Sequence, residues 1–469
     1  MGSFFGGLIA RHFTFRRVLG CAVVAAMATL WFVTATKRPY VGEALPLGAA
    51  PPSSLGQEHQ ANDRSRELLI LLGFSGGGTR AAALAYGVLQ ELAETHIVTS
   101  AGRRRLLDEV DGISSVSGGS FTNAYFGLFG DRIFDDFKDV MLLRPIQDDL
   151  IKGLFTPTNW HDLSSPYYGS NDLAASYYDE HIFEGKTFSD IDPSTAPLII
   201  INASDIGTGE RMVFTRHLLN MLCVDYDAYP VSRAVAASSG VPGAASPIAI
   251  KNHAGNCGYK VPDWMLDAEA LSTNRVIAAK IKRGLNYLDA NKRPWLHLVD
   301  GGITDNLGLR QYYEFTHLSR GIEEFFEEYT GTQVNDVLII SVNAAVEHRL
   351  PWAKLPETPS ERQTLGSMTH IQMRNYTSDT LHIVERAYED WESSRSSGAA
   401  QAQFDFVEVT FAAVKDDEER AYLNELPTSL QLSEEQVDRL VSAGRQLLRE
   451  SPSFRNFLSR YPSDANSEQ

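Results

Sequence analysis

The stretch Gly112-Ile-Ser-Ser-Val-Ser-Gly-Gly-Ser120 joins a predicted strand to a predicted helix through a turn of small residues. Residues 110–116 lean toward apolar character and predict a strand, and residues 118–129 predict the helix. A tight strand-to-helix turn that exposes one hydroxyl at the edge of a sheet is a nucleophile elbow. The exposed hydroxyl here is that of Ser117. Ser115 replaces the glycine of the commoner Gly-x-Ser-x-Gly pattern, so an ordinary turn is the alternative interpretation.

The same order of strand, glycine-rich turn and helix occurs upstream. Residues 68–72 form a continuous apolar run, which is typical of a strand buried on both faces of a parallel sheet. Residues 79–94 are rich in alanine and leucine and predict a helix. Apolar runs at 198–202, 296–299 and 337–342 predict further strands. Alternating strands and helices predict a three-layer α/β/α sandwich with a mostly parallel sheet, whose sites lie at the C-terminal ends of strands.

Three consecutive glycines, Gly76, Gly77 and Gly78, follow the first of these strands. A backbone without side chains can approach a substrate closely, and the N-terminus of the following helix favours negative charge. Their N–H groups are therefore candidate donors for an oxyanion hole. A phosphate-binding loop for a nucleotide is the alternative, but Thr79 and Arg80 stand where that loop requires lysine followed by serine or threonine.

A serine nucleophile needs a neighbouring base, and Asp300 is the best candidate. It ends a predicted strand and is followed by two glycines that let the backbone turn away. A partly desolvated carboxylate there would have a raised pKa, which suits proton abstraction. An Asp-Gly-Gly turn without chemistry is the alternative. His297 is a rival base, although its spacing from Asp300 predicts the opposite face of the strand; His253, in a predicted loop, is another.

Together these segments resemble the patatin-like phospholipase family, and the matching segments run in the family's order from residue 68 to 309. The resemblance implies that Ser117 is the nucleophile and Asp300 the base of a dyad that replaces the usual triad, with the three loop glycines as oxyanion donors. Residues 202–214 and 234–242 also resemble family sequence, the latter as a turn that supports the dyad.

Arg80 matches an arginine that the family carries beside the glycine loop. The resemblance allows its guanidinium to contact a lipid phosphate, because arginine forks suit phosphate oxygens. A surface or helix-pairing role is the alternative. The sequence departs from the family pattern at Ser115 and in a long segment between Pro242 and Pro294, which leaves substrate access open.

The N-terminus predicts a membrane segment. An uncharged stretch, 18–36, lies between basic residues and is barely long enough to span a bilayer. We interpret residues 1–40 as an uncleaved signal-anchor, with a cleaved secretory signal peptide as the alternative. A faint excess of positive charge before the segment predicts that the catalytic body lies on the non-cytoplasmic side. Residues 41–66, rich in Pro, Ala, Gly and Ser, predict a flexible linker.

Residues 67–350 are expected to form the catalytic domain. The aromatic-rich insertion at 131–190 is either a cap over the site or a peripheral packing module. Residues 351–469 predict a helical C-terminal extension. The body holds two of the three cysteines, Cys223 and Cys257; they could pair, but two buried thiols are the preferred interpretation.

Composition narrows the range of functions. A hydrophobic content of 43% with 10% aromatic residues is typical of a globular protein. The net charge of −17 argues against a nucleic-acid partner and against electrostatic attraction of the whole body to anionic lipid.

We therefore predict a membrane-tethered lipid acyl hydrolase that works through an acyl-serine intermediate without a metal or organic cofactor. Its expected partners are a lipid or phospholipid substrate and the membrane. One alternative is an α/β-hydrolase esterase with a Ser-His-Asp triad. Another is a non-catalytic membrane protein that keeps the fold for lipid binding or scaffolding.

Overall fold

The structure is a computed structural model that describes most of the chain. The ranges are 38–48, 64–100, 102–242, 245–261, 275–318, 334, 336–346, 356–395 and 403–462. The predicted signal-anchor segment, 18–36, lies outside them. Within these ranges, no helix has both the length and the apolar character needed to cross a membrane.

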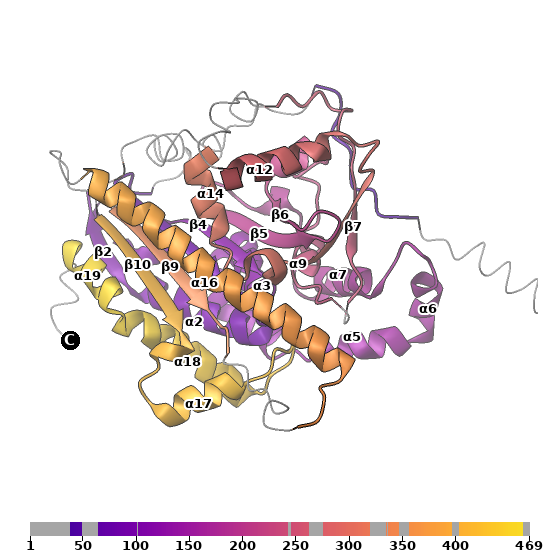
Figure 1. The fold of residues 1–469 in the computed structure, drawn as a ribbon. Coiled ribbons are helices and arrows are strands. Elements are labelled where there is room, and N and C mark those ends of the chain that lie inside the picture. Colours follow the sequence, from indigo (N-terminus) through magenta and orange to yellow (C-terminus); the bar gives the residue numbers. More distant parts are fainter. Residues whose placement is uncertain are drawn as a thin grey trace, which may run out of the picture.

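An eight-stranded sheet forms the middle of the molecule (Figure 1). Its strands are β1 (Leu68–Phe74), β4 (Val110–Val116), β5 (Leu198–Asp205), β6 (Glu210–Phe214), β7 (Ile248–Lys251), β8 (Trp295–Asp300), β9 (Asp336–Asn343) and β10 (Gln403–Thr410). The order is β10-β9-β1-β4-β5-β8-β7, with β6 also pairing with β5. The neighbours from β10 to β5 are parallel, whereas β6, β7 and β8 pair in the antiparallel sense. A separate hairpin consists of β2 (His96–Thr99) and β3 (Gly102–Arg105).

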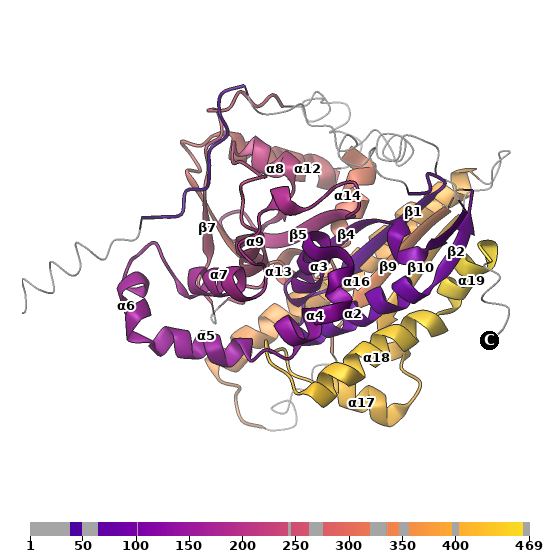
Figure 2. The ribbon, with the colours of Figure 1, turned by 180° about the vertical axis from the view of Figure 1, so that it is seen from behind.

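Both faces of the sheet are covered by helices. On one face lie α2 (Thr79–Glu94), α3 (Gly118–Phe129) and α18 (Glu434–Glu450), and on the other lie α14 (Arg310–Leu318) and α16 (Glu361–Arg395). The alternation of side chains along β1 sets this arrangement: Ile70 and Leu72 join the core under α2, while Leu69 and Leu71 join the core under α16. Figures 1 and 2 show α16 and α18 on opposite sides of the sheet. The predicted three-layer sandwich is confirmed.

The remaining helices connect and buttress the layers. They are α4 (Ile133–Phe137), α5 (Ile146–Phe155), α6 (Pro157–Leu163), α7 (Ser170–His181), α8 (Arg216–Met221), α9 (Val231–Ser238), α12 (Arg275–Gly284), α13 (Gly302–Asp305), α17 (Asp417–Glu425) and α19 (Pro452–Arg460). The insertion at 131–190 thus contains α4 to α7. Its helix α7 packs against α9, whereas α5 and α6 project from the body (Figures 1 and 2).

The expectation of a purely helical C-terminal extension is wrong for residues 403–410. They form β10, which pairs in parallel with β9 along its whole length and extends the central sheet. The side chains of these residues alternate between the two faces of the sheet, but the helical patterns on either side obscure this alternation in the sequence. Phe404 and Phe406 pack under α16, whereas Val407 and Val409 pack on the opposite face. The C-terminal part therefore completes the sandwich.

The preference for two free thiols is also wrong. Cys223 and Cys257 form a disulfide, with their Cα atoms 5.5 Å apart. Cys223 follows α8 and Cys257 lies in the loop after β7. The folding of β7 brings the two together, and the 34-residue separation in sequence gives no sign of it.

Candidate active site

Ser117 occupies a strained turn between β4 and α3. Its φ of 51° lies in the left-handed region, which is unusual for a residue other than glycine. The main-chain N–H of Ser117 donates a 2.8 Å hydrogen bond to Oγ of Ser238, which holds the turn in place. Strain of this kind persists where the surroundings enforce it and is frequent at functional sites. The predicted elbow is therefore present in the structure.

The end of β4 meets the end of β8 along one edge of β5, because β6 occupies the other edge. Val116, the last residue of β4, pairs with Asn202. Asp300, the last residue of β8, pairs with the next residue of β5, Ala203. Since β8 runs antiparallel to β4, the two C-terminal ends point at each other. This arrangement brings Ser117 beside Asp300.

The two side chains are hydrogen-bonded. Ser117 Oγ donates to Asp300 Oδ2 at 2.7 Å, and the Gly302 N–H donates to Asp300 Oδ1 at 2.8 Å. Asp300 is only 8% exposed. Burial raises its pKa to about 6, against the opposing effects of the hydrogen bonds from Gly302 and Ser117. The carboxylate is thus ionised at neutral pH and basic enough to accept the serine proton.

The glycine loop lies against the elbow. Gly77 has φ +143° and Gly78 φ +63°, conformations that favour glycine. A Cβ at Gly76 would lie 3.3 Å from Ser117 Cβ, so the loop passes directly beside the candidate nucleophile. A Cβ at Gly118 would overlap the main chain of Gly78. Glycine on both sides permits this close approach.

The three loop N–H groups are not equivalent. The Gly76 N–H donates a 3.0 Å hydrogen bond to the carbonyl oxygen of Asn306, so the expectation of Gly76 as an oxyanion donor is not supported. Within the described ranges, the N–H groups of Gly77 and Gly78 donate to no other group. These two therefore stay as the predicted donors at the start of α2.

A comparison with known families agrees with this geometry. The profile described as Patatin-like phospholipase matches residues 72–313, which is just over half of the chain. The chain belongs to the patatin-like phospholipase family. The matched range includes the glycine loop, Ser117 and Asp300. A comparison with curated proteins found no match.

Among the solved structures similar to this patatin-like chain are two of human GIVD cytosolic phospholipase A2. One shares 14% identity, with a TM-score of 0.40, and the alignment covers 87% of this chain and 65% of that one. The other, in complex with methyl gamma-linolenyl fluorophosphonate, shares 13% identity, with a TM-score of 0.41 and coverages of 89% and 70%. The chain thus spans about two thirds of the length of this relative.

Ser115, the departure from the family's usual glycine, is fully buried and has hydrogen-bond partners. Its Oγ donates to the carbonyl oxygen of Ile200 at 3.1 Å and accepts a 2.8 Å hydrogen bond from Asn123 Nδ2. The extra hydroxyl therefore ties the nucleophile strand to β5 and α3.

The proposed contact of Arg80 with a lipid phosphate is wrong. The side chain is buried, with Nε donating to the carbonyl oxygen of Ala344 at 3.0 Å and Nη1 to that of Leu426 at 2.6 Å. Nη2 donates to Thr428 Oγ1 at 3.1 Å. Burial lowers the pKa of Arg80 to about 10. In this member of the patatin-like family, the arginine fastens the C-terminal segment to the glycine loop.

The two rival histidines lie away from the dyad contacts. His297 is exposed on β8, and His253 Nε2 is 2.9 Å from the carbonyl oxygen of Val41. The hydrogen bonds that reach the Asp300 carboxylate from the described residues come from Ser117 and Gly302. Among the described residues, no histidine therefore takes part in the contact between Ser117 and Asp300.

Three polar residues surround the dyad: Asn202, Ser238 and Asn306. Residues 234–242, which include Ser238, were expected to support the dyad, and Asn202 begins the other segment that resembles the family; Asn306 was not predicted. Ser238 accepts a hydrogen bond from the Ser117 N–H, and Asn202 donates one to the carbonyl oxygen of Ser115, in the strand that leads to the elbow. Asn306 holds the glycine loop through its carbonyl oxygen. Ser238 ends α9 and Asn306 follows α13, whereas Asn202 lies within β5, where no local pattern indicates its role.

Proposed function

We propose that the protein is a serine hydrolase that cleaves carboxylic esters of lipids, with Ser117 as nucleophile and Asp300 as base. The observation that carries the proposal is the 2.7 Å hydrogen bond from the strained Ser117 to a buried carboxylate whose pKa is raised to about 6. A serine with an adjacent base has the arrangement required for covalent catalysis.

In the proposed first step, Ser117 Oγ attacks the ester carbonyl while its proton moves to Asp300 Oδ2. The N–H groups of Gly77 and Gly78 receive the developing oxyanion. Collapse of the tetrahedral intermediate breaks the ester C–O bond, and Asp300 returns the proton to the departing alcohol. In the second step, Asp300 takes a proton from water as the water attacks the acyl-serine. Collapse of this second intermediate breaks the bond between Ser117 Oγ and the acyl carbon, Asp300 returns the proton to Ser117 Oγ, and the fatty acid leaves.

Labelling with a fluorophosphonate tests the nucleophile. We expect the purified protein to react covalently at Ser117 and the Ser117→Ala variant to remain unlabelled. Peptide mass spectrometry then locates the adduct. Labelling that persists in Ser117→Ala refutes the assignment. A Ser-His-Asp esterase is tested by replacing each histidine in turn, since loss of activity in one of those variants would favour it.

The location of the enzyme is part of the proposal. The predicted N-terminal anchor would place the body on the non-cytoplasmic side. The Cys223–Cys257 disulfide supports that side, because disulfides persist in oxidising compartments. A secreted form after signal cleavage is the alternative, and sequencing the N-terminus of the mature protein distinguishes the two.

An exposed apolar surface on the insertion supports action at a lipid surface. We call it the α5–α6 surface, and its members are Ile151 (47% exposed), Phe155 (73%), Trp160 (52%) and Tyr167 (54%). Figures 1 and 2 both show α5 beside one end of α16. Farther along α16, Met373 Cε would lie 2.8 Å from a Cβ at Gly302, next to Asp300. We propose that lipid approaches from this side.

A further inference from the structure

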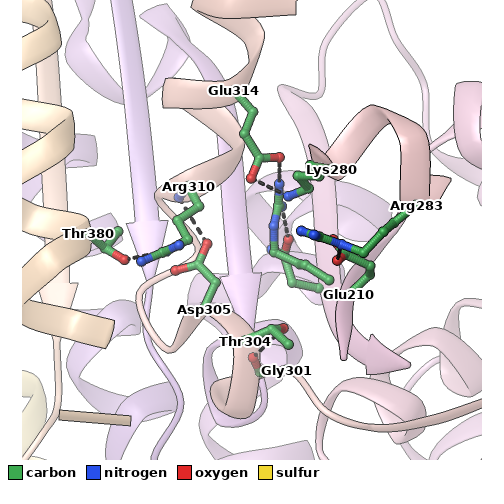
Figure 3. Close-up of polar contacts among 11 residues, drawn as sticks. Glu210, Lys280, Arg283, Gly301, Thr304, Asp305, Arg310, Glu314 and Thr380 are labelled. Atoms are coloured by element: carbon green, nitrogen blue, oxygen red, sulfur yellow. Dashed lines mark hydrogen bonds and ion pairs between the residues drawn. The ribbon is translucent and has the colours of Figure 1, made fainter. Parts of the chain in front are cut away.

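Charged side chains from α12, α14 and β6 form a connected group (Figure 3). Glu314 on α14 accepts from Lys280 of α12 through Oε1 and from Arg211 of β6 through Oε2. The side chains of Arg211 and Glu314 are 4% and 11% exposed. Burial favours the neutral form of Glu314, but Arg211 and Lys280 more than compensate, so that its pKa lies below the ordinary value. Glu314 is therefore a charged anchor for Arg211.

The other arm of Arg211 reaches Asn202. Arg211 Nη1 donates a 2.6 Å hydrogen bond to Asn202 Oδ1, while Nη2 binds Glu314. A planar guanidinium can hold both acceptors in fixed directions, which a lysine ammonium cannot do in the same way. The amide of Asn202 is thereby fixed with its Nδ2 pointing toward the nucleophile strand.

Asn202 holds that strand at two points and the elbow at a third. Its Nδ2 donates to the carbonyl oxygen of Ser115 and to Ser114 Oγ, both at 2.9 Å. Its main-chain oxygen accepts a 2.6 Å hydrogen bond from Ser238 Oγ, the same atom that accepts from the Ser117 N–H. Two hydrogen bonds thus connect the Asn202 backbone to the nucleophile.

The aspartate side of the dyad rests on the same residue. A Cβ at Gly301, the residue after Asp300, would overlap the carbonyl of Asn202, so the turn packs directly on it. The Gly301 N–H donates to the carbonyl oxygen of Ser238 at 3.1 Å. Asn202 is fully buried. A shift of its main chain would therefore be transmitted to both members of the dyad.

Buried ion pairs contribute little net stability on average, because desolvation offsets their attraction, and they are better attested as devices that fix one arrangement. We infer that Arg211 and Asn202 are positioning residues that set the separation between Ser117 and Asp300, and that Lys280 and Glu314 orient Arg211. This inference rests on the proposed function. It gives a role to α12, which lies in the segment between Pro242 and Pro294 that departs from the family pattern.

The first test compares Arg211→Met with Arg211→Lys in the full-length protein on a soluble ester. Lysine keeps a positive charge beside Glu314 but cannot hold both acceptors. A role in neutralising Glu314 would be rescued by lysine, whereas a role in orienting Asn202 would not. We expect both variants to lose kcat by about 100-fold, as small misplacements of catalytic groups do, with KM within about twofold of the wild type.

The pH profile supplies a readout that a loss of folded protein would not move. The hydrogen bond from Ser117 lowers the pKa of Asp300, so a longer bond lets that pKa rise. We expect the acidic limb of kcat/KM to shift to higher pH in both Arg211 variants. The shift in Arg211→Lys is decisive, because the local charge is retained there. Normal kcat and an unshifted limb in Arg211→Lys overturn the inference.

Arg283→Met is the matched control. Arg283 also lies on α12 and binds Glu210, but it makes no contact with Asn202. It is expected to keep wild-type kcat. An equal loss in Arg283→Met would show a general effect of α12 and overturn the inference. If Arg211→Met fails to fold, Arg211→Lys and Asn202→Ser decide. Wild-type activity in Ser117→Ala or Asp300→Asn would instead refute the proposed function.

Discussion

Ser117 and Asp300 are 183 residues apart in the sequence, yet their side chains are hydrogen-bonded at 2.7 Å. The pairing follows from the sheet, because β4 and β8 run toward each other along one edge of β5 and end opposite consecutive residues, Asn202 and Ala203. The contact is therefore set by strand register. A change that alters β5 would change the distance between nucleophile and base.

Replacing Asp300 by Asn should abolish most of the ester hydrolysis. The amide cannot take the proton of Ser117, and general-base catalysis contributes about 10²–10⁴-fold in rate. We expect kcat/KM on a soluble ester to fall by this factor while the protein stays folded. Circular dichroism supplies the control for folding. Near-normal turnover in Asp300→Asn, with every histidine intact, would refute the dyad.

The acidic limb of the pH profile should report Asp300. Only the ionised carboxylate accepts the serine proton, and burial raises its pKa to about 6. Activity should therefore be half-maximal near pH 6 and should fall about tenfold for each further pH unit below it. An ordinary aspartate would place this limb near pH 4. His253→Gln and His297→Gln should leave the limb unchanged; displacement by either variant would assign it to a histidine.

The sequence was enough to predict the sandwich, because the alternation of strands and helices depends on local patterns. The proposed dyad came from the order of segments that resembles the family, and the structure brings its two side chains into contact. The apolar run at 68–72 is buried on both faces, as continuous hydrophobic strands are. Ser117 follows β4 directly, Asp300 ends β8, and the glycine loop has a recognisable spacing. In these segments, local pattern and final environment agree.

The rest depended on which segments meet in space. In the sequence, Arg80 has the pattern of a surface arginine. In the structure it is buried, because hydrogen-bond acceptors from residues 344 and 426–428 surround its guanidinium. Asn202 gains its role only when β4, β6 and β8 assemble around β5. The partners of both residues are remote in sequence, so no local spacing could indicate them.

Arg80→Met should destabilise the fold rather than change head-group preference. The substitution leaves two buried carbonyl oxygens without a donor, and each such loss costs about 1–3 kcal/mol. We expect the free energy of unfolding to fall by about 3 kcal/mol in urea titrations. The relative rates on phospholipids with different head groups should stay the same for the folded fraction. A selective loss with one head group and unchanged stability would restore the phosphate-contact role.

Loss of the disulfide should weaken the region around α8 and β7. Cross-linking residues 34 apart stabilises a fold by about 3 kcal/mol, chiefly by restricting the unfolded chain. We expect Cys257→Ala to lower the urea midpoint and reductant to do the same in the wild type. Cys21→Ala is the control, because the disulfide joins the other two cysteines. Reaction of all three cysteines with a thiol reagent in the unreduced, denatured protein would contradict the pairing.

The α5–α6 surface should matter for lipid in a bilayer but not for a soluble ester. Ile151 and Phe155 lie four residues apart on one face of α5, and both are exposed. The double change Ile151→Ser and Phe155→Ser removes apolar area that would leave water on contact with lipid, at about 25 cal/mol per Å². We expect hydrolysis of zwitterionic phosphatidylcholine vesicles to fall about tenfold, a loss on the scale of one such side chain. Activity on a short soluble ester should be unchanged.

Val98→Ser is the control, because Val98 is exposed on hairpin strand β2 at the other end of the molecule (Figure 1). Equal losses on both substrates would place the effect in the dyad, and no loss on either would remove this surface from the path of the lipid.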